Sequence, residues 1–204
     1  MIPSSKQISI DMLEQWILPV YDRANNNAKR GQCFIVGSYL ITAAHVIYLQ
    51  DEFIDAYVVL KNIPISLHRE QALLYEHSPQ IDENYHDYAV FALPEVSKSP
   101  LQLKSISDDE ECLTCFYKRN VKLEEGSVPH LALMTSEAKL NRLYSDNLFL
   151  CNVNPMLIKG DSGCPIVDKE NNVVGMLVAG DDKSICAFQS AVFIKNILNQ
   201  CIAN

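Results

Sequence analysis

Three residue types that together perform nucleophilic catalysis, a serine, a histidine and an aspartate, each stand at the edge of a predicted strand in this chain. The most informative is Ser162, in the segment 160–165 with the sequence Gly-Asp-Ser-Gly-Cys-Pro. Glycines let the backbone of a turn approach a substrate closely and adopt conformations that other residues avoid. Such a turn presents a serine hydroxyl, and its converging N–H groups can stabilise a developing oxyanion.

His45 and Asp87 lie upstream of this turn, each beside an apolar run. The stretches 31–36 and 39–41 predict two short strands, joined by a glycine-serine pair that suits a two-residue hairpin, and His45 follows them. Asp87 directly precedes the apolar run 88–93. A serine hydroxyl is a weak nucleophile until a base takes its proton, and imidazole suits that task near neutral pH. A carboxylate on the far ring nitrogen fixes the tautomer and stabilises the imidazolium.

On three motifs, TAAH ending at His45, DYAVFAL beginning at Asp87 and GDSG around Ser162, the chain resembles the trypsin/chymotrypsin-like serine protease family. The resemblance covers about residues 16–200, and the chain order His, Asp, Ser is the order of that family. It implies that His45 is the general base, Asp87 its orienting carboxylate and Ser162 the nucleophile. It also implies an oxyanion hole made by the backbone N–H groups of Gly160 and Ser162.

Many short apolar runs that end in one helical segment predict an all-β fold. The resemblance implies a pair of antiparallel β-barrels, the chymotrypsin-like double barrel, with a short helix at each end, over 5–18 and over about 192–202. We expect one peptidase unit, with the N-terminal helix and first barrel in 1–100 and the second barrel and C-terminal helix in 101–204. The site would then lie in the cleft between the barrels.

The resemblance also places the pocket for the residue before the scissile bond. Met156, six positions before the nucleophile, would be its floor, and the strand containing Val178, Ala179 and Gly180 would be its wall. A floor without an acid favours a small or medium apolar side chain, because an unpaired buried charge is costly. The aspartates at 181–182 are interpreted as a solvated turn. The alternative is that they attract a basic residue of the substrate.

Three departures from the family pattern concern the same site. Cys164 replaces a glycine usual after the serine, and a role in packing is expected for it. Val178 stands where many relatives place a serine that bonds the aspartate, so Asp87 is expected to use other donors, such as backbone N–H groups near His45. Asp161 lacks the new N-terminal ammonium that pairs with it in secreted zymogens. Either the site is preformed, or another molecule orders it. We hypothesise that a regulatory protein partner or a ligand does so.

Composition limits the alternatives. The chain has 204 residues, of which 48% are hydrophobic and 21% charged, as in ordinary globular domains. A net charge of −8 argues against nucleic acid as a partner, and no apolar stretch reaches the roughly 20 residues that span a membrane. An odd count of seven cysteines, Val46 in place of a family cysteine, and no N-terminal signal sequence predict a cytoplasmic location. The lone CxxC at 112–115 predicts no zinc site, and no metal or organic cofactor is expected.

Two functions remain open at this level. The first is a serine endopeptidase that acts on a protein or peptide substrate through an acyl-enzyme intermediate. The second is a protease-like binding module that has lost activity. An esterase of another fold is excluded by the chain order of the three residues. The compact spacing of the motifs resembles small bacterial peptidase domains, and this resemblance implies a role as an effector in a larger system such as antiviral (antiphage) defence.

Overall fold

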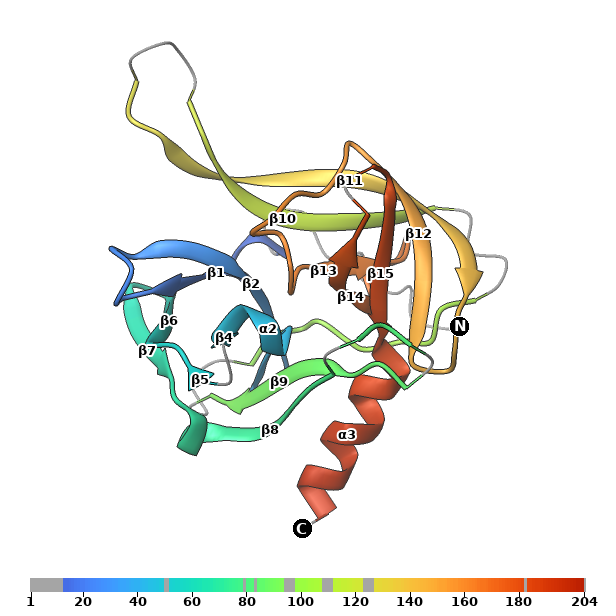
Figure 1. The fold of residues 1–204 in the computed structure, drawn as a ribbon, viewed down its shortest axis with the longest axis horizontal. Coiled ribbons are helices and arrows are strands. Elements are labelled where there is room, and N and C mark those ends of the chain that lie inside the picture. The colour runs from blue at the N-terminus through green and yellow to red at the C-terminus, as the bar shows by residue number, and fades with distance from the viewer. Residues whose placement is uncertain are drawn as a thin grey trace, which may run out of the picture.

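The computed structural model describes residues 13–49, 52–78, 80–82, 84–93, 98–107, 112–122, 127–181 and 183–203. Two main antiparallel sheets and one long C-terminal helix form most of it, so the predicted all-β double-barrel fold is confirmed (Figure 1). In chain order the elements are β1 (Ile17–Asp22), β2 (Ala28–Val36), β3 (Tyr39–Thr42), α2 (Ala44–Ile47), β4 (Tyr48–Leu49), β5 (Glu52–Phe53), β6 (Ala56–Leu60), β7 (Ile63–Leu67), η1 (Arg69–Gln71), β8 (Ala72–His77), β9 (Asp87–Ala92), β10 (Leu113–Val121), β11 (His130–Leu143), β12 (Leu148–Asn154), β13 (Pro165–Val167), β14 (Val173–Gly180), β15 (Ile185–Ser190) and α3 (Ala191–Ala203).

The first sheet has seven strands in the order β7-β6-β1-β2-β3-β9-β8. It curls around a core of fully buried side chains that includes Phe34, Ile35, Leu40, Ile41 and Val90 (Figure 1). Between the described strands, hydrogen bonds do not close this sheet into a ring, so the first of the two predicted barrels is a curled open sheet. The curl brings the ends of β3 and β9 to one rim, because these two strands are direct neighbours.

The hairpin between β2 and β3 forms as the sequence predicts. β2 ends at Val36 and β3 begins at Tyr39, so the turn has two residues. Gly37 has a φ of +57°, in the left-handed region that such a turn requires and that glycine adopts without steric cost. α2 follows β3 at once, and its Val46 and Ile47 are buried while its histidine stays partly exposed. This burial fixes the single helical turn that carries His45.

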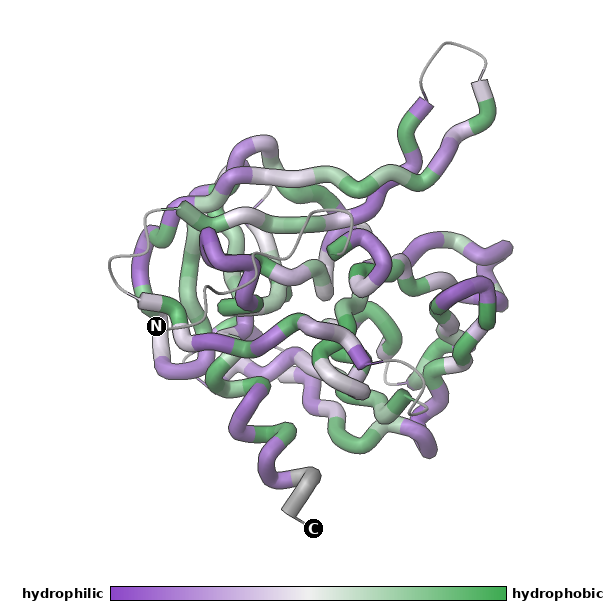
Figure 2. Tube along the Cα trace, turned by 180° about the vertical axis from the view of Figure 1, so that it is seen from behind, coloured by the Kyte–Doolittle hydropathy of each residue, from purple (hydrophilic) through white to green (hydrophobic). Residues whose placement is uncertain are grey.

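The second sheet is a closed barrel in the order β10-β11-β12-β15-β14-β13. Its own core contains Tyr117, Phe149, Ile166 and Phe188, and the rings of Phe149 and Phe188 stack with centroids 5.5 Å apart. Hydrophobic segments are frequent along the strands of both sheets, whereas hydrophilic ones mark many of the turns (Figure 2). The ribbon formed by β10 and β11 continues well beyond the barrel wall (Figure 1).

The structure describes the predicted C-terminal helix, but only the end of the predicted N-terminal one. The predicted C-terminal helix is confirmed as α3, and its Ile194, Ile197 and Leu198 are buried against the strands. Most of the predicted N-terminal helix, 5–18, lies outside the described residues. Its last two residues were assigned wrongly, because Ile17 and Leu18 begin strand β1, where they pair with β2 and are buried.

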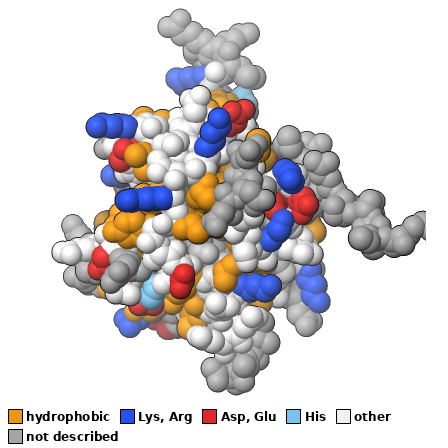
Figure 3. Space-filling view, turned by 90° about the vertical axis from the view of Figure 1, so that its right-hand side faces the viewer, with side chains coloured by type: hydrophobic (Ala, Val, Ile, Leu, Met, Phe, Trp, Pro, Cys, Tyr) orange, Lys and Arg blue, Asp and Glu red, His pale blue; other side chains and the backbone are white. Residues whose placement is uncertain are grey.

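Outside the cores the surface is mixed in character. On the face shown in Figure 3, hydrophobic side chains occur in several groups separated by charged and polar ones. In the part of the chain that the structure describes, no helix is long and apolar enough to cross a membrane.

The two sheets are joined by the buried side chain of Gln32 on β2. Its Nε2 donates to the carbonyl oxygen of Lys118 on β10 at 2.9 Å, and its Oε1 accepts from the N–H of Lys118 at 2.9 Å. The N–H of Gln32 also donates to the carbonyl oxygen of Ser162 at 2.8 Å. These three bonds fix the turn that carries Ser162 directly against the first sheet.

Candidate active site

The structure brings His45 and Asp87 into direct contact. The ring Nδ1 of His45 lies 2.5 Å from Asp87 Oδ2, and the backbone N–H of His45 donates to Oδ1 at 2.9 Å. Asp87 is fully buried as the first residue of β9, whereas the side chain of His45 remains 32% exposed. The two-point contact holds the ring with Nδ1 toward the carboxylate, so Nε2 is the nitrogen available to exchange a proton with another group.

Two further side chains complete the surroundings of the Asp87 carboxylate. The Tyr85 hydroxyl donates to Oδ2 at 3.0 Å, and His77 Nδ1 lies 3.4 Å from Oδ1. Burial acts to raise the pKa of the Asp87 carboxyl, but the hydrogen bonds from His45 and then His77 outweigh it and bring this pKa well below its ordinary value. Asp87 is therefore ionised at neutral pH, as a carboxylate that orients an imidazole must be.

His77 and Tyr85 were missed as site residues by the sequence analysis. The pairing of β8 with β9 places His77 directly opposite Asp87, a register that no local pattern reveals. Tyr85 carries a weak signal, because it stands two residues before the aspartate. The expectation that Asp87 uses donors other than a residue at position 178 agrees with these contacts. Val178 is buried in the core, and its apolar side chain offers the carboxylate no hydrogen-bond donor.

Ser162 occupies a tight turn between β12 and β13. Gly160 and Gly163 flank it with φ values of +94° and +83°, which side chains rarely adopt. Gly163 also has no room for a side chain, since a Cβ there would lie 2.1 Å from the carbonyl oxygen of Gln32. Its N–H donates to Leu177 on β14 at 2.8 Å, which ties the turn to the barrel.

His45 and Ser162 face one cavity of about 350 Å³, although they come from different sheets. Among the described residues, the Ser162 hydroxyl makes no hydrogen bond to the His45 ring. Such bonds are commonly long in unliganded hydrolases and tighten when substrate binds. Ser162 and His45 thus line one cavity, and Asp87 holds the His45 ring from its Nδ1 side.

The predicted oxyanion donors are available. Within the described part of the chain, the backbone N–H groups of Gly160 and Ser162 have no acceptor. By contrast, the N–H of Asp161 donates to Ile158 at 3.0 Å and that of Cys164 to Asp161 at 3.1 Å. The turn therefore satisfies its other donors internally and leaves these two free to bind a negatively charged oxygen.

Asp161, between the two free donors, is buried and held by cations of this chain. The Arg119 guanidinium on β10 binds it through Nε, at 3.1 Å from Oδ2, and through Nη2. Lys29 Nζ on β2 lies 3.7 Å from Oδ1, and the N–H of Ile158 donates to Oδ2 at 2.9 Å. Arg119 Nη2 also donates to the carbonyl oxygen of Met156 at 3.3 Å. The segment before Ser162 is thereby anchored to both sheets.

Cys164 is fully buried behind the turn, as expected for a packing role. Burial raises the pKa of its thiol well above the ordinary value, and the nearby Asp161 charge adds to this. The nucleophilic form of cysteine is the thiolate. Cys164 therefore stays protonated and does not compete with Ser162.

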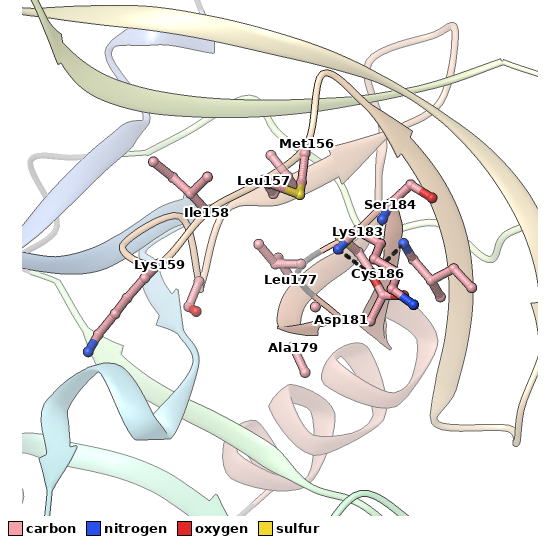
Figure 4. A pocket seen from close by; sticks show the side chains of 13 residues that line it. Met156, Leu157, Ile158, Lys159, Leu177, Ala179, Asp181, Lys183, Ser184 and Cys186 are labelled. Atoms are coloured by element: carbon pink, nitrogen blue, oxygen red, sulfur yellow. Dashed lines mark hydrogen bonds between the residues drawn. The ribbon is translucent and has the colours of Figure 1, made fainter.

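A second cavity, of about 200 Å³, also has Ser162 in its lining (Figure 4). Its lining combines an apolar interior with polar groups near the mouth: Met156, Leu157, Ile158, Lys159, Ser162, Leu177, Ala179, Gly180, Asp181, Lys183, Ser184, Ile185 and Cys186. Of the predicted pocket residues, Met156, Ala179 and Gly180 line this cavity. Met156, predicted as the floor of the pocket, is 41% exposed where it lines this cavity. The side chain of Val178 points into the core and does not line the cavity.

Asp181 belongs to a turn at the mouth of this second cavity. Its Oδ1 accepts from the backbone N–H groups of Lys183, Ser184 and Ile185, at 2.9, 3.0 and 3.0 Å (Figure 4). One carboxylate oxygen is therefore engaged by the chain itself, in agreement with the interpretation of this segment as a turn. Asp182 lies outside the described residues.

No candidate metal centre accompanies these residues. In the described ranges, no group of three or more His, Cys, Asp or Glu side chains lies close enough to hold a metal ion. The chemistry available to the site is that of an ionised aspartate, an oriented imidazole, a serine hydroxyl and two free N–H groups.

Comparison with solved structures identifies the fold, whereas no protein-family model and no curated protein matches the sequence. The Rv3671c protease from Mycobacterium tuberculosis, in its active form, aligns with a TM-score of 0.63 and 16% identity over 96% of this chain and 85% of that one. The serine endoprotease from Yersinia pestis aligns with a TM-score of 0.66 and 13% identity over 100% of this chain and 69% of that one. The tobacco vein mottling virus protease aligns with a TM-score of 0.62 and 10% identity over 89% and 79%. The chain therefore has the fold of the trypsin/chymotrypsin-like serine proteases.

Proposed function

We propose that this protein is a serine endopeptidase that uses His45, Asp87 and Ser162. The observation that carries the proposal is that Ser162, His45 and Gly160 line one cavity, with the imidazole held by a buried, ionised aspartate. Each element supplies one function that acyl transfer requires: a nucleophile, a base and oxyanion donors.

In this mechanism, Ser162 Oγ attacks the scissile carbonyl carbon while His45 Nε2 takes the hydroxyl proton. The N–H groups of Gly160 and Ser162 donate to the oxyanion of the tetrahedral intermediate. The imidazolium then gives its proton to the leaving amine, and the peptide bond breaks to leave an acyl ester on Ser162. Water, deprotonated by His45, releases the acyl group by the same steps, and no cofactor takes part.

The second cavity supports a preference for a small or medium apolar side chain before the scissile bond. Leu157, Leu177, Ala179 and Cys186 supply apolar walls, and a volume of about 200 Å³ suits a side chain of moderate size. The polar groups, including Asp181 and Lys183, lie toward the mouth. An apolar interior binds an apolar side chain by excluding water from both surfaces.

An extended peptide is the proposed substrate. Within β14, only the part at 173–176 pairs with β13. Among the described strands, the backbone at 179–180 therefore has a neighbour on one side alone, which is β15. An exposed edge of this kind binds a peptide as an added strand. The structure of tobacco etch virus protease complexed with substrate, which aligns with a TM-score of 0.65 and 13% identity over 94% of this chain and 86% of that one, supports a peptide ligand for the fold.

Regulation by a partner remains part of the proposal to be tested. The ion pairs of Asp161 with Arg119 and Lys29 favour a site that is formed without a partner. The six cysteines whose side chains are described are free thiols, which supports a reducing, cytoplasmic location. A role in antiviral defence stays a prediction from the sequence.

Labelling with a fluorophosphonate probe, read by intact-protein mass spectrometry, tests the function. We expect one adduct on the wild-type chain, none on Ser162→Ala, and an unchanged adduct on Ser66→Ala, a serine remote from the site. Hydrolysis of a degenerate peptide library by the purified chain then tests gating. Strong cleavage without any partner would exclude the gated form of the proposal.

The alternative is a protease-like binding module. The observation that favours it is that, among the described residues, no hydrogen bond joins the Ser162 hydroxyl to the His45 ring. Absence of labelling in folded wild-type protein, together with binding of library peptides without cleavage, would support this alternative over the enzyme.

A further inference from the structure

The cavity that His45 and Ser162 line, called the shared cavity below, has basic but no acidic residues in its lining. Its lining consists of Lys29, Arg30, His45, Lys159, Gly160 and Ser162. Three of these six residues have lysine or arginine side chains, and none is acidic. The whole chain has a net charge of −8, so this positive lining is a local feature that runs against the average charge of the protein.

The chemistry of the proposed reaction determines which part of a substrate enters this cavity. His45 must give its proton to the leaving amine, so the leaving group passes beside the imidazole. His45 lines this cavity and does not line the second cavity, of about 200 Å³, which we call the apolar cavity because its buried lining residues are apolar. The shared cavity therefore receives the residues after the scissile bond, and the apolar cavity receives the residue before it.

Two of the three cations have no acidic partner in the described structure. Lys29 is committed to Asp161, at 3.7 Å, and donates to the carbonyl oxygen of Lys118. Neither Arg30 nor Lys159 forms an ion pair or hydrogen bond with another described residue. The Lys159 side chain extends away from the other labelled residues of the apolar cavity (Figure 4). Arg30, on β2, and Lys159, in the turn before Ser162, thus line the cavity without an acidic partner among the described residues.

We propose that Arg30 and Lys159 form an acid-binding subsite that selects substrates with aspartate or glutamate immediately after the scissile bond. This inference rests on the proposed peptidase function and adds a substrate class to it. A carboxylate in the cavity forms charge-assisted hydrogen bonds, which are stronger than bonds between neutral groups. The positive lining also raises the local concentration of acidic peptides at the nucleophile.

Paired fluorogenic peptides test the subsite. One member carries Glu and the other Gln directly after the cleaved bond, within a sequence taken from a library profile of the wild-type chain. Gln matches Glu in size and lacks only the charge. We expect kcat/KM to be about tenfold higher for the Glu peptide at low salt, and the ratio to shrink in 0.5 M NaCl because salt screens exposed charges. Equal values for the two peptides would overturn the proposal.

Substitutions then assign the effect to residues. Arg30→Met and Lys159→Met should each lower the Glu/Gln ratio by about threefold, and the double variant should bring it near one. Arg30→Glu should reverse the order and favour a Lys peptide. Arg142→Met, which removes the same charge from an exposed position on β11, is the matched control and should keep the wild-type ratio. A double variant that retains the preference would contradict the assignment.

A binding measurement separates failure of this inference from failure of the proposed function. Ser162→Ala is titrated with fluorescein-labelled peptide pools that are degenerate except for one fixed Glu or Gln. Tighter binding of the Glu pool supports the subsite, provided that adding Arg30→Met and Lys159→Met abolishes the difference between the pools. This holds even if the wild-type chain shows no labelling or hydrolysis. Equal binding of both pools overturns the subsite, whether or not the chain is an active peptidase.

Discussion

The Arg119 guanidinium binds the buried carboxylate of Asp161, the residue directly before Ser162, through two of its nitrogens. Burial acts to lower the pKa of Arg119, but the hydrogen bonds to Asp161 outweigh it and raise this pKa above its ordinary value. Arg119 therefore stays charged throughout the range in which a histidine-dependent hydrolase works. It connects β10 to the segment that carries both free N–H groups.

Removal of the guanidinium should release this segment. We expect Arg119→Met to lower kcat by about 100-fold with a smaller effect on KM, because the oxyanion donors lose their fixed positions. The free energy of unfolding should fall by about 3 kcal/mol, because a buried carboxylate loses its main partner. Steady-state kinetics and urea unfolding measure the two effects, and amide hydrogen exchange of the peptide spanning 158–164 should become faster.

Two controls accompany Arg119→Met. Arg142→Met should leave kinetics and stability within experimental error of wild type. The double variant Arg119→Met/Asp161→Asn should be more stable than Arg119→Met alone, since it removes the unpaired charge as well. A double variant that is less stable than the single one would show that Arg119 does not act through Asp161.

Gly163 should tolerate no side chain. We expect Gly163→Ala to lower the free energy of unfolding by at least about 3 kcal/mol, because its φ is +83° and the new Cβ would lie 2.1 Å from the Gln32 carbonyl oxygen. Gly37→Ala is the matched control: its φ is +57°, but no atom lies within 4 Å of the added Cβ. It should cost only about 1 kcal/mol. Equal losses in urea unfolding would mean that backbone strain alone accounts for both positions.

The depressed pKa of Asp87 predicts a pH-dependent contribution to stability. A carboxyl whose folded pKa lies below its unfolded value of about 4 stabilises the fold above that value, and the stabilisation is lost as the pH falls toward the folded pKa. Asp87→Asn should therefore lower the free energy of unfolding by roughly 2 kcal/mol at pH 7, and the difference should shrink below about pH 4.

Urea unfolding from pH 7 to pH 3 measures this difference. Asp55→Asn is the control, because Asp55 is exposed and pairs with an exposed Arg23, so its loss should change stability by less than about 1 kcal/mol at any pH. A difference between Asp87→Asn and wild type that stays constant down to pH 3 would contradict the assigned cause. In the same variant kcat should fall by about 10⁴-fold, because the imidazole loses its orienting charge.

The sequence carries the parts of the site that depend on local chemistry. A glycine-serine pair predicts the two-residue hairpin before His45, and glycines on both sides of Ser162 predict a turn. In the structure all three of these glycines have positive φ values. Strand edges beside Asp87 follow from its apolar neighbours. These features come from residues that are adjacent in the chain, so pattern and spacing are sufficient to predict them.

Tertiary structure alone decided what surrounds these residues. His77 reaches Asp87 through the register of β8 against β9, and Arg119 reaches Asp161 across 42 residues of chain. The exposure of Met156 beside its cavity and the burial of Val178 in the core depend on how the barrel closes. A local pattern specifies which groups a turn offers, whereas their partners and charges are set by strand pairings distant in sequence.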